Sequence, residues 1–300
     1  MILFISLLMK VINKYDTIKN KVIIMSMSPV VKWAGGKRQI IEKIKAALPG
    51  QFNSYYEPFV GGGAVLFELA PKTAVINDVN QELLAIYKCL QDRELFDLMV
   101  EELDKHEANH SEDYYLEVRA WDRNPRFELE PIWKRAARAI YLNKACFNGL
   151  YRVNAKGYFN VPSAKKEKVK TYDAQNLEEI YEYFSNENVQ ILNGDFVEAC
   201  RTAKSGDFVY FDPPYDVPED KGSFTAYSKF DFTKEDQIRL ANCFKKLSEK
   251  GVKCMLSNHN TPFINELYEG FNIQVITARR NINSKGDARG AVEEVIITNY

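Results

Sequence analysis

Seven short apolar segments alternate with helical stretches along most of the chain, and this alternation constrains the fold more than any other feature. The pattern is typical of an open α/β sheet with helices on both faces. We therefore predict an α/β fold built on seven strands. The predicted strands lie at residues 55–60, 74–77, 189–192, 208–211, 252–257, 273–277 and 294–298, and predicted helices at 38–48, 65–70, 79–90 and 234–250.

More than a hundred residues separate the second predicted strand from the third. A crossover of that length is far outside the usual range, so we expect an inserted module at 91–188. Within it, residues 134–170 carry ten Lys and Arg side chains against the single acid Glu167, which leaves −10 on the rest of a chain whose net charge is −1. A local positive field steers association with a polyanion. A solvated Lys-rich surface would also account for these charges.

The composition argues against several other classes of protein. Hydrophobic residues make up 46% and charged residues 27% of the 300 residues, as in an ordinary folded domain. Five cysteines form no CxxC pair and three histidines show no ligand spacing, so we expect no disulfide framework, no metal site and a cytoplasmic location. The apolar residues 1–9 are too few to span a bilayer, so we expect no membrane segment and interpret residues 1–28 as an N-terminal extension.

A glycine-rich turn, in the segment EPFVGGG, follows the first predicted strand. Gly61 and Gly63 precede a predicted helix, where glycine lets a ligand approach the backbone N–H groups closely. Asp78, fifteen residues beyond Gly63, ends the second strand and is placed to accept hydrogen bonds from ribose hydroxyls. Because the spacing is neither GxGxxG nor a P-loop, these residues favour an adenosyl cofactor. A tight turn followed by a surface acid is the simpler alternative.

A second glycine turn, KWAGGK, lies upstream of the first. Trp33 can pack against one side of a cofactor, and Lys37 can hold a cofactor carboxylate. The alternative is that Trp33 is a packing residue near the start of a domain.

The segment Asp212-Pro213-Pro214-Tyr215 directly follows a hydrophobic strand, at the edge where open sheets place their chemistry. Consecutive prolines cannot continue a strand and fix a stiff turn. The Asp212 carboxylate and the Pro213 carbonyl can accept the two hydrogens of an exocyclic amine, while the Tyr215 ring stacks on the base that carries it. The turn therefore predicts a site for an aromatic amine, and a plain surface turn is the alternative.

Four motifs occur in the order KWAGGK, EPFVGGG, IND and DPPY, and the basic insertion lies between the last two. With these motifs the chain resembles Dam-type N6-adenine-specific DNA methyltransferases of the alpha-type amino-methyltransferase arrangement. The likeness runs from about residue 31 to residue 300. It implies a Rossmann-like S-adenosylmethionine-dependent methyltransferase sheet of seven strands, with residues 29–90 and 189–300 as the catalytic domain and 91–188 as a mostly helical DNA target-recognition domain. It also implies S-adenosylmethionine as methyl donor, without a metal, and double-stranded DNA as the substrate.

The resemblance assigns roles residue by residue. At the cofactor it places Trp33, Lys37, Phe59, Gly61, Gly63, Asp78, Asp195, Phe196 and Asp212; in catalysis Asp212, Pro213 and Tyr215; and at the DNA Lys32, Asn148, Leu150 and Arg152. Leu150 would enter the base stack, and Arg152 would donate two hydrogen bonds to a guanine edge. The segment 147–152 is similar to that of members specific for GATC, which implies GATC as the target. A cognate restriction endonuclease acting at the same site is left open as a partner.

The implied mechanism begins with flipping of the target adenine, because N6 is stacked and paired inside the duplex. Direct in-line attack on the methyl group follows. No cysteine follows a proline, as a cytosine C5 mechanism would need, and the zinc ligands of a deaminase are absent. Two alternatives stay open: a methyltransferase acting on another planar amine (RNA adenine, cytosine N4 or a protein amide), and a non-catalytic DNA-binding relative.

Overall fold

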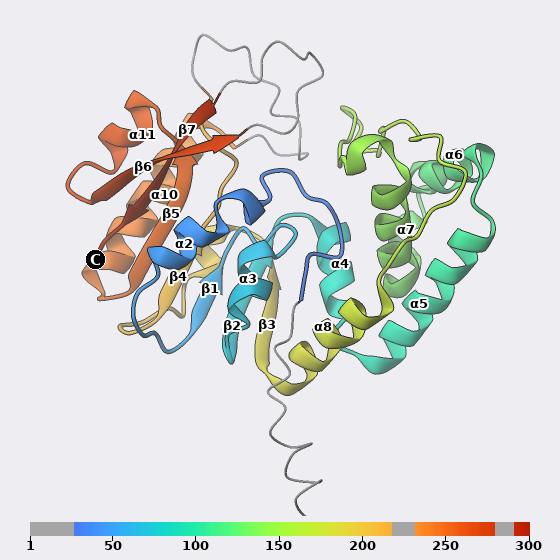
Figure 1. The fold of residues 1–300 in the computed structure, drawn as a ribbon, viewed down its shortest axis with the longest axis horizontal. Coiled ribbons are helices and arrows are strands. Elements are labelled where there is room, and N and C mark those ends of the chain that lie inside the picture. Colours follow the sequence, from blue (N-terminus) through green and yellow to red (C-terminus); the bar gives the residue numbers. More distant parts are fainter. Residues whose placement is uncertain (1–26, 218–231, 280–290) are drawn as a thin grey trace, which may run out of the picture.

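The computed structural model describes residues 27–217, 232–279 and 291–300; most of the predicted N-terminal extension and residues 280–290 of the C-terminal motif lie outside these ranges. The described chain contains a sheet of seven strands in the order β3-β2-β1-β4-β5-β7-β6 (Figure 1). The predicted α/β fold with a seven-stranded, Rossmann-like sheet is confirmed. The strands are β1 (Tyr55–Glu57), β2 (Thr73–Asp78), β3 (Asn188–Asn193), β4 (Phe208–Phe211), β5 (Lys253–His259), β6 (Asn272–Arg279) and β7 (Ala291–Thr298).

Strand direction decides where the loops emerge. Each neighbouring pair from β3 to β5 is parallel, whereas β7 runs antiparallel to both β5 and β6. The loops that follow β1, β2, β3 and β4 therefore leave the sheet at one edge. β1 is shorter than the predicted strand 55–60 because Pro58 has no N–H to donate to a ladder.

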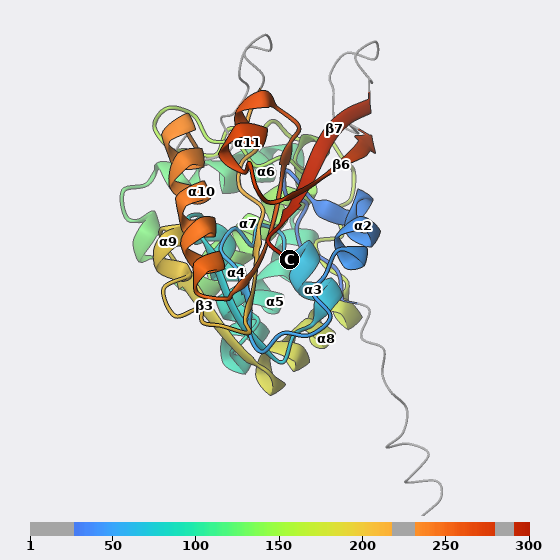
Figure 2. The same ribbon diagram turned by 90° about the vertical axis from the view of Figure 1, so that its left-hand side faces the viewer.

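Alternate residues of each strand face opposite sides of the sheet, as the period of two requires. In β4, Phe208 and Tyr210 belong to one hydrophobic cluster, and Val209 and Phe211 belong to another. The first cluster includes side chains of α2 (Ile41–Ala46), α3 (Ala64–Leu69), α4 (Gln81–Cys89) and α8 (Ala174–Asn186). The second includes side chains of α9 (Phe196–Ala199), α10 (Lys234–Glu249) and α11 (Pro262–Leu267), so helices cover both faces (Figure 2).

Between β2 and β3 the chain is mainly helical. Here α5 (Arg93–Ala108), α6 (Glu112–Ala120) and α7 (Ile132–Ala145) form a lobe beside the sheet (Figure 1). The lobe has a core of its own around Tyr115 and Tyr141. Phe96 of α5 and Ile140 of α7 nevertheless belong to the same cluster as the sheet, so the lobe packs firmly against it. The boundaries proposed for an inserted domain, 91 and 188, stay a prediction.

The described residues contain no helix long and apolar enough to cross a membrane. Nor do three or more His, Cys, Asp or Glu side chains gather in these same ranges as a metal site would need. The five cysteines are buried free thiols.

Candidate active site

Two glycines with positive φ shape the turn after β1. Gly61 has φ 49°, and Gly63, at the N-cap of α3, has φ 74°, values that side-chain-bearing residues rarely adopt. The Gly61 N–H donates to Asp78 Oδ2 at 3.1 Å, and the Asn80 N–H donates to Asp78 Oδ1 at 2.9 Å. Burial raises the pKa of Asp78 to about 6, although both N–H groups favour its charged form. The structure therefore brings Gly61, Gly63 and Asp78 together at the sheet edge.

Trp33 lies against this turn. A Cβ added at Gly61 would lie 3.0 Å from Trp33 Cδ1, and one at Gly62 would lie 3.3 Å from Trp33 Cβ. The Trp33 ring also lies against the Tyr151 ring, with 4.9 Å between centroids and 32° between planes. Trp33 thus contacts both the glycine turn and the segment that follows α7.

Lys37 and Asp212 form an ion pair at the centre of the site. Lys37 Nζ lies 2.7 Å from Asp212 Oδ1, donates to the Gly35 carbonyl at 2.6 Å and lies 4.5 Å from the centre of the Tyr215 ring. Since Lys37 is only 4% exposed, these neighbours replace water around its ammonium group. Burial raises the pKa of Asp212 to about 6, and the charge of Lys37 opposes this rise. The contact of Lys37 with Asp212 was not predicted, and its role toward a cofactor carboxylate stays a prediction.

Two buried amides hold the Asp212–Tyr215 turn from behind. Gln237 of α10 donates from Nε2 to the Pro214 carbonyl at 2.9 Å. Asn258 of β5 accepts the Asp216 N–H at 2.8 Å and donates to Gln237 Oε1 at 3.1 Å. Sequence reasoning missed both residues. A glutamine among the apolar positions of the predicted helix 234–250 was the available signal.

The Tyr215 ring is held at two points. Its hydroxyl donates to Glu294 Oε2 of β7 at 3.2 Å. Its ring lies edge-on to the His259 ring, with 4.9 Å between centroids and 76° between planes. Burial raises the pKa of Tyr215 well above its usual value, so the hydroxyl is a neutral donor. The ring therefore has a fixed orientation beside Asp212.

Glu57, the last residue of β1, is a buried acid that sequence reasoning did not assign. It is 2% exposed, and its Oε2 accepts a hydrogen bond from the Tyr55 hydroxyl at 2.9 Å. Burial raises the pKa of Glu57 well above its usual value, and the charge of Asp212 raises it further. Among the described residues, Lys37 pairs with Asp212 rather than with Glu57.

Three phenylalanines form an apolar wall near the end of β3. The ring centroids of Phe59 and Phe196 are 5.3 Å apart, and Phe232 lies 5.7 Å and 6.0 Å from them. Asp195 caps α9 by accepting the Val197 N–H at 2.9 Å, and its other oxygen accepts from Arg239 at 2.7 Å. The structure brings Phe59, Asp195 and Phe196 together and adds Phe232, which no motif marked; their role toward a cofactor stays a prediction.

The residues predicted at the DNA lie on two segments that meet. The Asn148 backbone has φ 57°, and Asn148 and Arg152 are exposed. The Arg152 guanidinium donates from Nε to Asn160 Oδ1 at 2.7 Å. Leu150 is half-buried against the core of the helical lobe rather than fully exposed. Lys32 is exposed and lies next to this turn.

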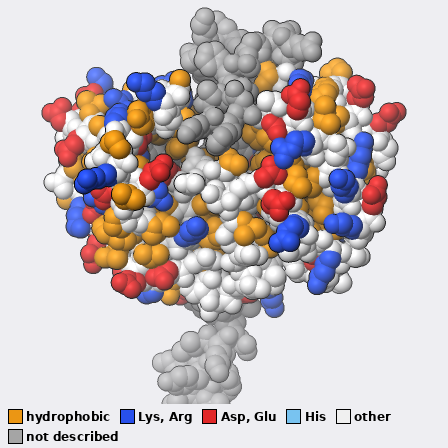
Figure 3. Space-filling view, turned by 180° about the vertical axis from the view of Figure 1, so that it is seen from behind, with side chains coloured by type: hydrophobic (Ala, Val, Ile, Leu, Met, Phe, Trp, Pro, Cys, Tyr) orange, Lys and Arg blue, Asp and Glu red, His pale blue; other side chains and the backbone are white. Residues whose placement is uncertain are grey.

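The positive charge of residues 134–170 is partly neutralised. Four of its ten cations pair with acids that precede the interval: Lys134 with Glu130, Arg135 with Glu82, Arg138 with Asp122 and Lys165 with Glu112. Arg138 is buried as well. From behind the view of Figure 1, basic and acidic side chains lie interspersed over the surface (Figure 3). The charge count along the sequence therefore overstates the free positive charge of this segment.

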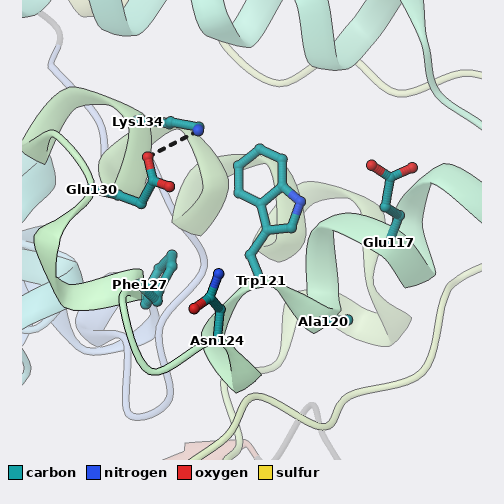
Figure 4. A pocket seen from close by; sticks show the side chains of 7 residues that line it. All are labelled: Glu117, Ala120, Trp121, Asn124, Phe127, Glu130 and Lys134. Carbon is teal, nitrogen blue, oxygen red and sulfur yellow. Dashed lines mark hydrogen bonds and ion pairs between the residues drawn. The ribbon is translucent and has the colours of Figure 1, made fainter.

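A pocket in the helical lobe is separate from this site (Figure 4). Among its polar groups, Lys134 donates to Glu130 at 2.9 Å and lies 5.1 Å from the centre of the Trp121 ring. No residue predicted for catalysis, cofactor or DNA lines it. The lining residues are Glu117, Ala120, Trp121, Asn124, Phe127, Glu130 and Lys134.

Comparisons with known proteins agree on one family. The model of the D12 class N6 adenine-specific DNA methyltransferases matches residues 33–282. The chain is 45% identical to the Type II methyltransferase M1.LlaDCHI of Lactococcus lactis subsp. cremoris, over 94% of this chain and 98% of that protein. It is 43% identical to the Type II methyltransferase M.MjaIII of Methanocaldococcus jannaschii, over 92% and 100%. It is 31% identical to the DNA adenine methylase of Escherichia coli strain K12, over 89% and 93%.

Gly63→Ala should lower the free energy of unfolding by about 1–3 kcal/mol, because alanine is strained at positive φ. The new Cβ would also lie 2.8 Å from the Tyr87 hydroxyl and 2.9 Å from the Phe67 ring. Urea denaturation measures the change. Gly50→Ala is the matched control, since no heavy atom lies within 4 Å of its added Cβ. Equal losses in the two variants would contradict the strain assigned to Gly63.

Proposed function

Because the chain belongs to the D12 class of N6 adenine-specific DNA methyltransferases, we propose that it methylates adenine N6 within GATC in duplex DNA, on a base flipped out of the helix. The likeness of segment 147–152 to GATC-specific members supports the target. One observation carries the assignment of the site: the Asp212 carboxyl lies at the sheet edge, paired with Lys37 at 2.7 Å and beside the fixed ring of Tyr215.

The family implies S-adenosylmethionine as the methyl donor, and the residues at the sheet edge fit it. Trp33 packs against the glycine turn, and the half-buried Asp78 carboxyl beside it can accept from ribose hydroxyls. Phe59 and Phe196 offer an apolar wall suited to an adenine ring. When bound, this cofactor supplies a methyl group on a positively charged sulfur. The proposed binding residues are Trp33, Lys37, Phe59, Gly61, Gly63, Asp78, Asp195, Phe196 and Asp212.

In the proposed mechanism, the turn at 212–215 fixes the exocyclic amine of the flipped adenine. The Asp212 carboxylate and the Pro213 carbonyl accept its two hydrogens, which directs the nitrogen lone pair toward the methyl group. Tyr215 stacks on the base and contributes about 1–3 kcal/mol, which offsets part of the few kcal/mol that unstacking costs. Lys37 favours the ionised form of Asp212, which accepts a hydrogen bond from the amine more strongly than the protonated form does.

On the DNA side, the proposed contacts are Lys32, Asn148, Leu150 and Arg152. Arg152 would read a guanine edge and Leu150 would enter the stack. Leu150 must then leave part of its contact with the lobe core. The Type II designation of two relatives supports a cognate restriction endonuclease acting at the same site as a partner, and action on DNA supports a cytoplasmic location.

Asp212→Ala should abolish methyl transfer and leave duplex affinity largely unchanged, because the variant loses an acceptor for the amine and no proposed DNA contact. Labelled methyl transfer to a GATC-containing plasmid, followed by digestion with a methylation-blocked GATC endonuclease, measures this. Asp97→Ala, an exposed acid paired with Arg93, is the control. Normal turnover in Asp212→Ala would refute the role assigned to Asp212. If the wild type labels the plasmid but does not protect it from the endonuclease, the target lies outside GATC. If the wild type does not label the plasmid, the result would support a non-catalytic protein.

The kcat/KM for DNA should fall as the pH is lowered through about 6, because the pKa of Asp212 is raised to about 6 and its protonated form is a weaker acceptor for the amine. Lys37→Met removes the charge that lowers this pKa, so the acidic limb should move to higher pH. A pH–rate profile at saturating S-adenosylmethionine measures both. Lys45→Met, whose ammonium pairs with the acids Glu42 and Glu68, is the control. An unmoved limb in Lys37→Met would contradict this assignment.

Arg152→Ala should relax discrimination at one base pair by about 1–3 kcal/mol if its base contact is bidentate. The ratio of kcat/KM between GATC and duplexes substituted at each position measures this. Arg201→Ala, a strongly exposed arginine paired with Glu198, is the control. An unchanged preference across the substituted duplexes would count against the contact.

A further inference from the structure

We propose that Asn143 of α7 is a positioning residue that fixes the DNA-reading turn 147–150 against the backbone of Lys32. This rests on the proposed function of that turn. Asn143 is 5% exposed, and its amide joins three segments. Its Oδ1 accepts the Lys32 N–H at 2.8 Å, and its Nδ2 donates to the carbonyls of Lys32 at 2.8 Å and Gly149 at 3.0 Å.

The turn packs against the Lys32 side chain. Gly149 has φ 66°, and a Cβ there would lie 2.7 Å from Lys32 Cδ and 3.3 Å from the Asn143 carbonyl oxygen. Asn148, with φ 57°, is likewise left-handed. Two successive left-handed residues form a tight turn, which the hydrogen bond from Asn143 to Gly149 ties to α7 and a second bond, from the Phe147 N–H to the Pro162 carbonyl at 2.9 Å, ties to the following segment.

The same segment contacts the proposed cofactor site. Trp33, next to Lys32 in the chain, lies against the Tyr151 ring at 4.9 Å and against the glycine turn at Gly61. Residues 32 and 33 therefore connect the reading turn on one side with the glycine turn on the other. Asn143 sets the position of Leu150 and Arg152 relative to the site of transfer, while it contacts neither the proposed cofactor site nor the reacting atoms.

Loss of the two Nδ2 hydrogen bonds would leave the carbonyls of Lys32 and Gly149 without this donor in a partly buried place, and we expect that cost to move the turn. The chemistry at Asp212 does not depend on those bonds. We therefore expect discrimination between DNA sequences to fall more than the rate on the cognate site.

A second asparagine supplies a matched control. Asn176 of α8 accepts the Ser28 N–H at 2.7 Å and donates to the Ser28 carbonyl at 2.9 Å, the same pair of bonds that Asn143 makes to Lys32. It makes no hydrogen bond to the reading turn among the described residues. Substitution of Asn176 therefore measures the effect of losing such a bond pair elsewhere in the fold.

The test compares Asn143→Asp with Asn176→Asp. Aspartate keeps the acceptor and removes the donor, so Asn143→Asp loses both Nδ2 bonds. Methylation of double-stranded oligonucleotides with GATC, and with each base pair of GATC replaced, gives kcat and KM at saturating S-adenosylmethionine. We expect the discrimination of Asn143→Asp to fall by about 5- to 150-fold, which is the contribution of one good base contact. Its KM should rise, with a smaller change in kcat. Asn176→Asp should discriminate as the wild type does.

Gly149→Ala is a second variant that displaces the turn without changing the Asn143 side chain, and it should lose discrimination in the same direction. If Asn143→Asp fails to fold, as thermal unfolding would show, Gly149→Ala alone decides the outcome. Wild-type discrimination in the folded variants, or equal losses in Asn143→Asp and Asn176→Asp, would overturn the proposal. A wild-type protein that methylates a site other than GATC refutes the target alone, and the same comparison is then made on that site. A wild type that methylates no DNA refutes the proposed function and this inference with it.

Discussion

The shared direction of β1 to β4 is the constraint on which the site depends. β1 pairs in parallel with both β2 and β4, with Tyr55 opposite Ala74 on one side and Phe208 on the other. The residues that follow these strands therefore emerge at the same edge, where the glycine turn meets Asp78 and the Asp212–Tyr215 turn. Lys37 reaches Asp212 only because both segments lie at that edge. Loops with no common scaffold could not hold this ion pair in a fixed place.

Polar groups buried around the site are paired, and this pairing gives the turn its rigidity. Lys37, Glu57, Gln237 and Asn258 are all buried, where an unpaired polar group would cost about 1–3 kcal/mol. Each has a defined partner, and Gln237 and Asn258 donate or accept along the backbone of residues 214–216. A turn of consecutive prolines has no ladder hydrogen bonds to fix it, so side chains of α10 and β5 perform this task. The groups proposed as acceptors are therefore oriented by the protein itself.

The sequence was sufficient for the features that depend on neighbours in the chain. Seven strands were predictable because their apolar runs are local, and Asp78 was predictable because it ends one of them. Three features were not predictable, because the residues that form them are distant in sequence. They are the pairing of Lys37 with Asp212, the hydrogen bonds of Gln237 and Asn258 to residues 214–216, and the contact of Phe232 with the other two phenylalanines. The charge of residues 134–170 was overestimated for the same reason: the acids that pair with four of its cations precede the interval.

Lys32 and Trp33 are adjacent in the chain but serve opposite sides of the site. Lys32 lies against the turn proposed to read DNA, and Trp33 lies against the glycine turn proposed to hold the cofactor. The peptide unit that joins them is planar, so only a few rotatable bonds separate the two contacts. The proposed DNA contact and the proposed cofactor contact therefore share one short segment, which Asn143 holds through the backbone of Lys32.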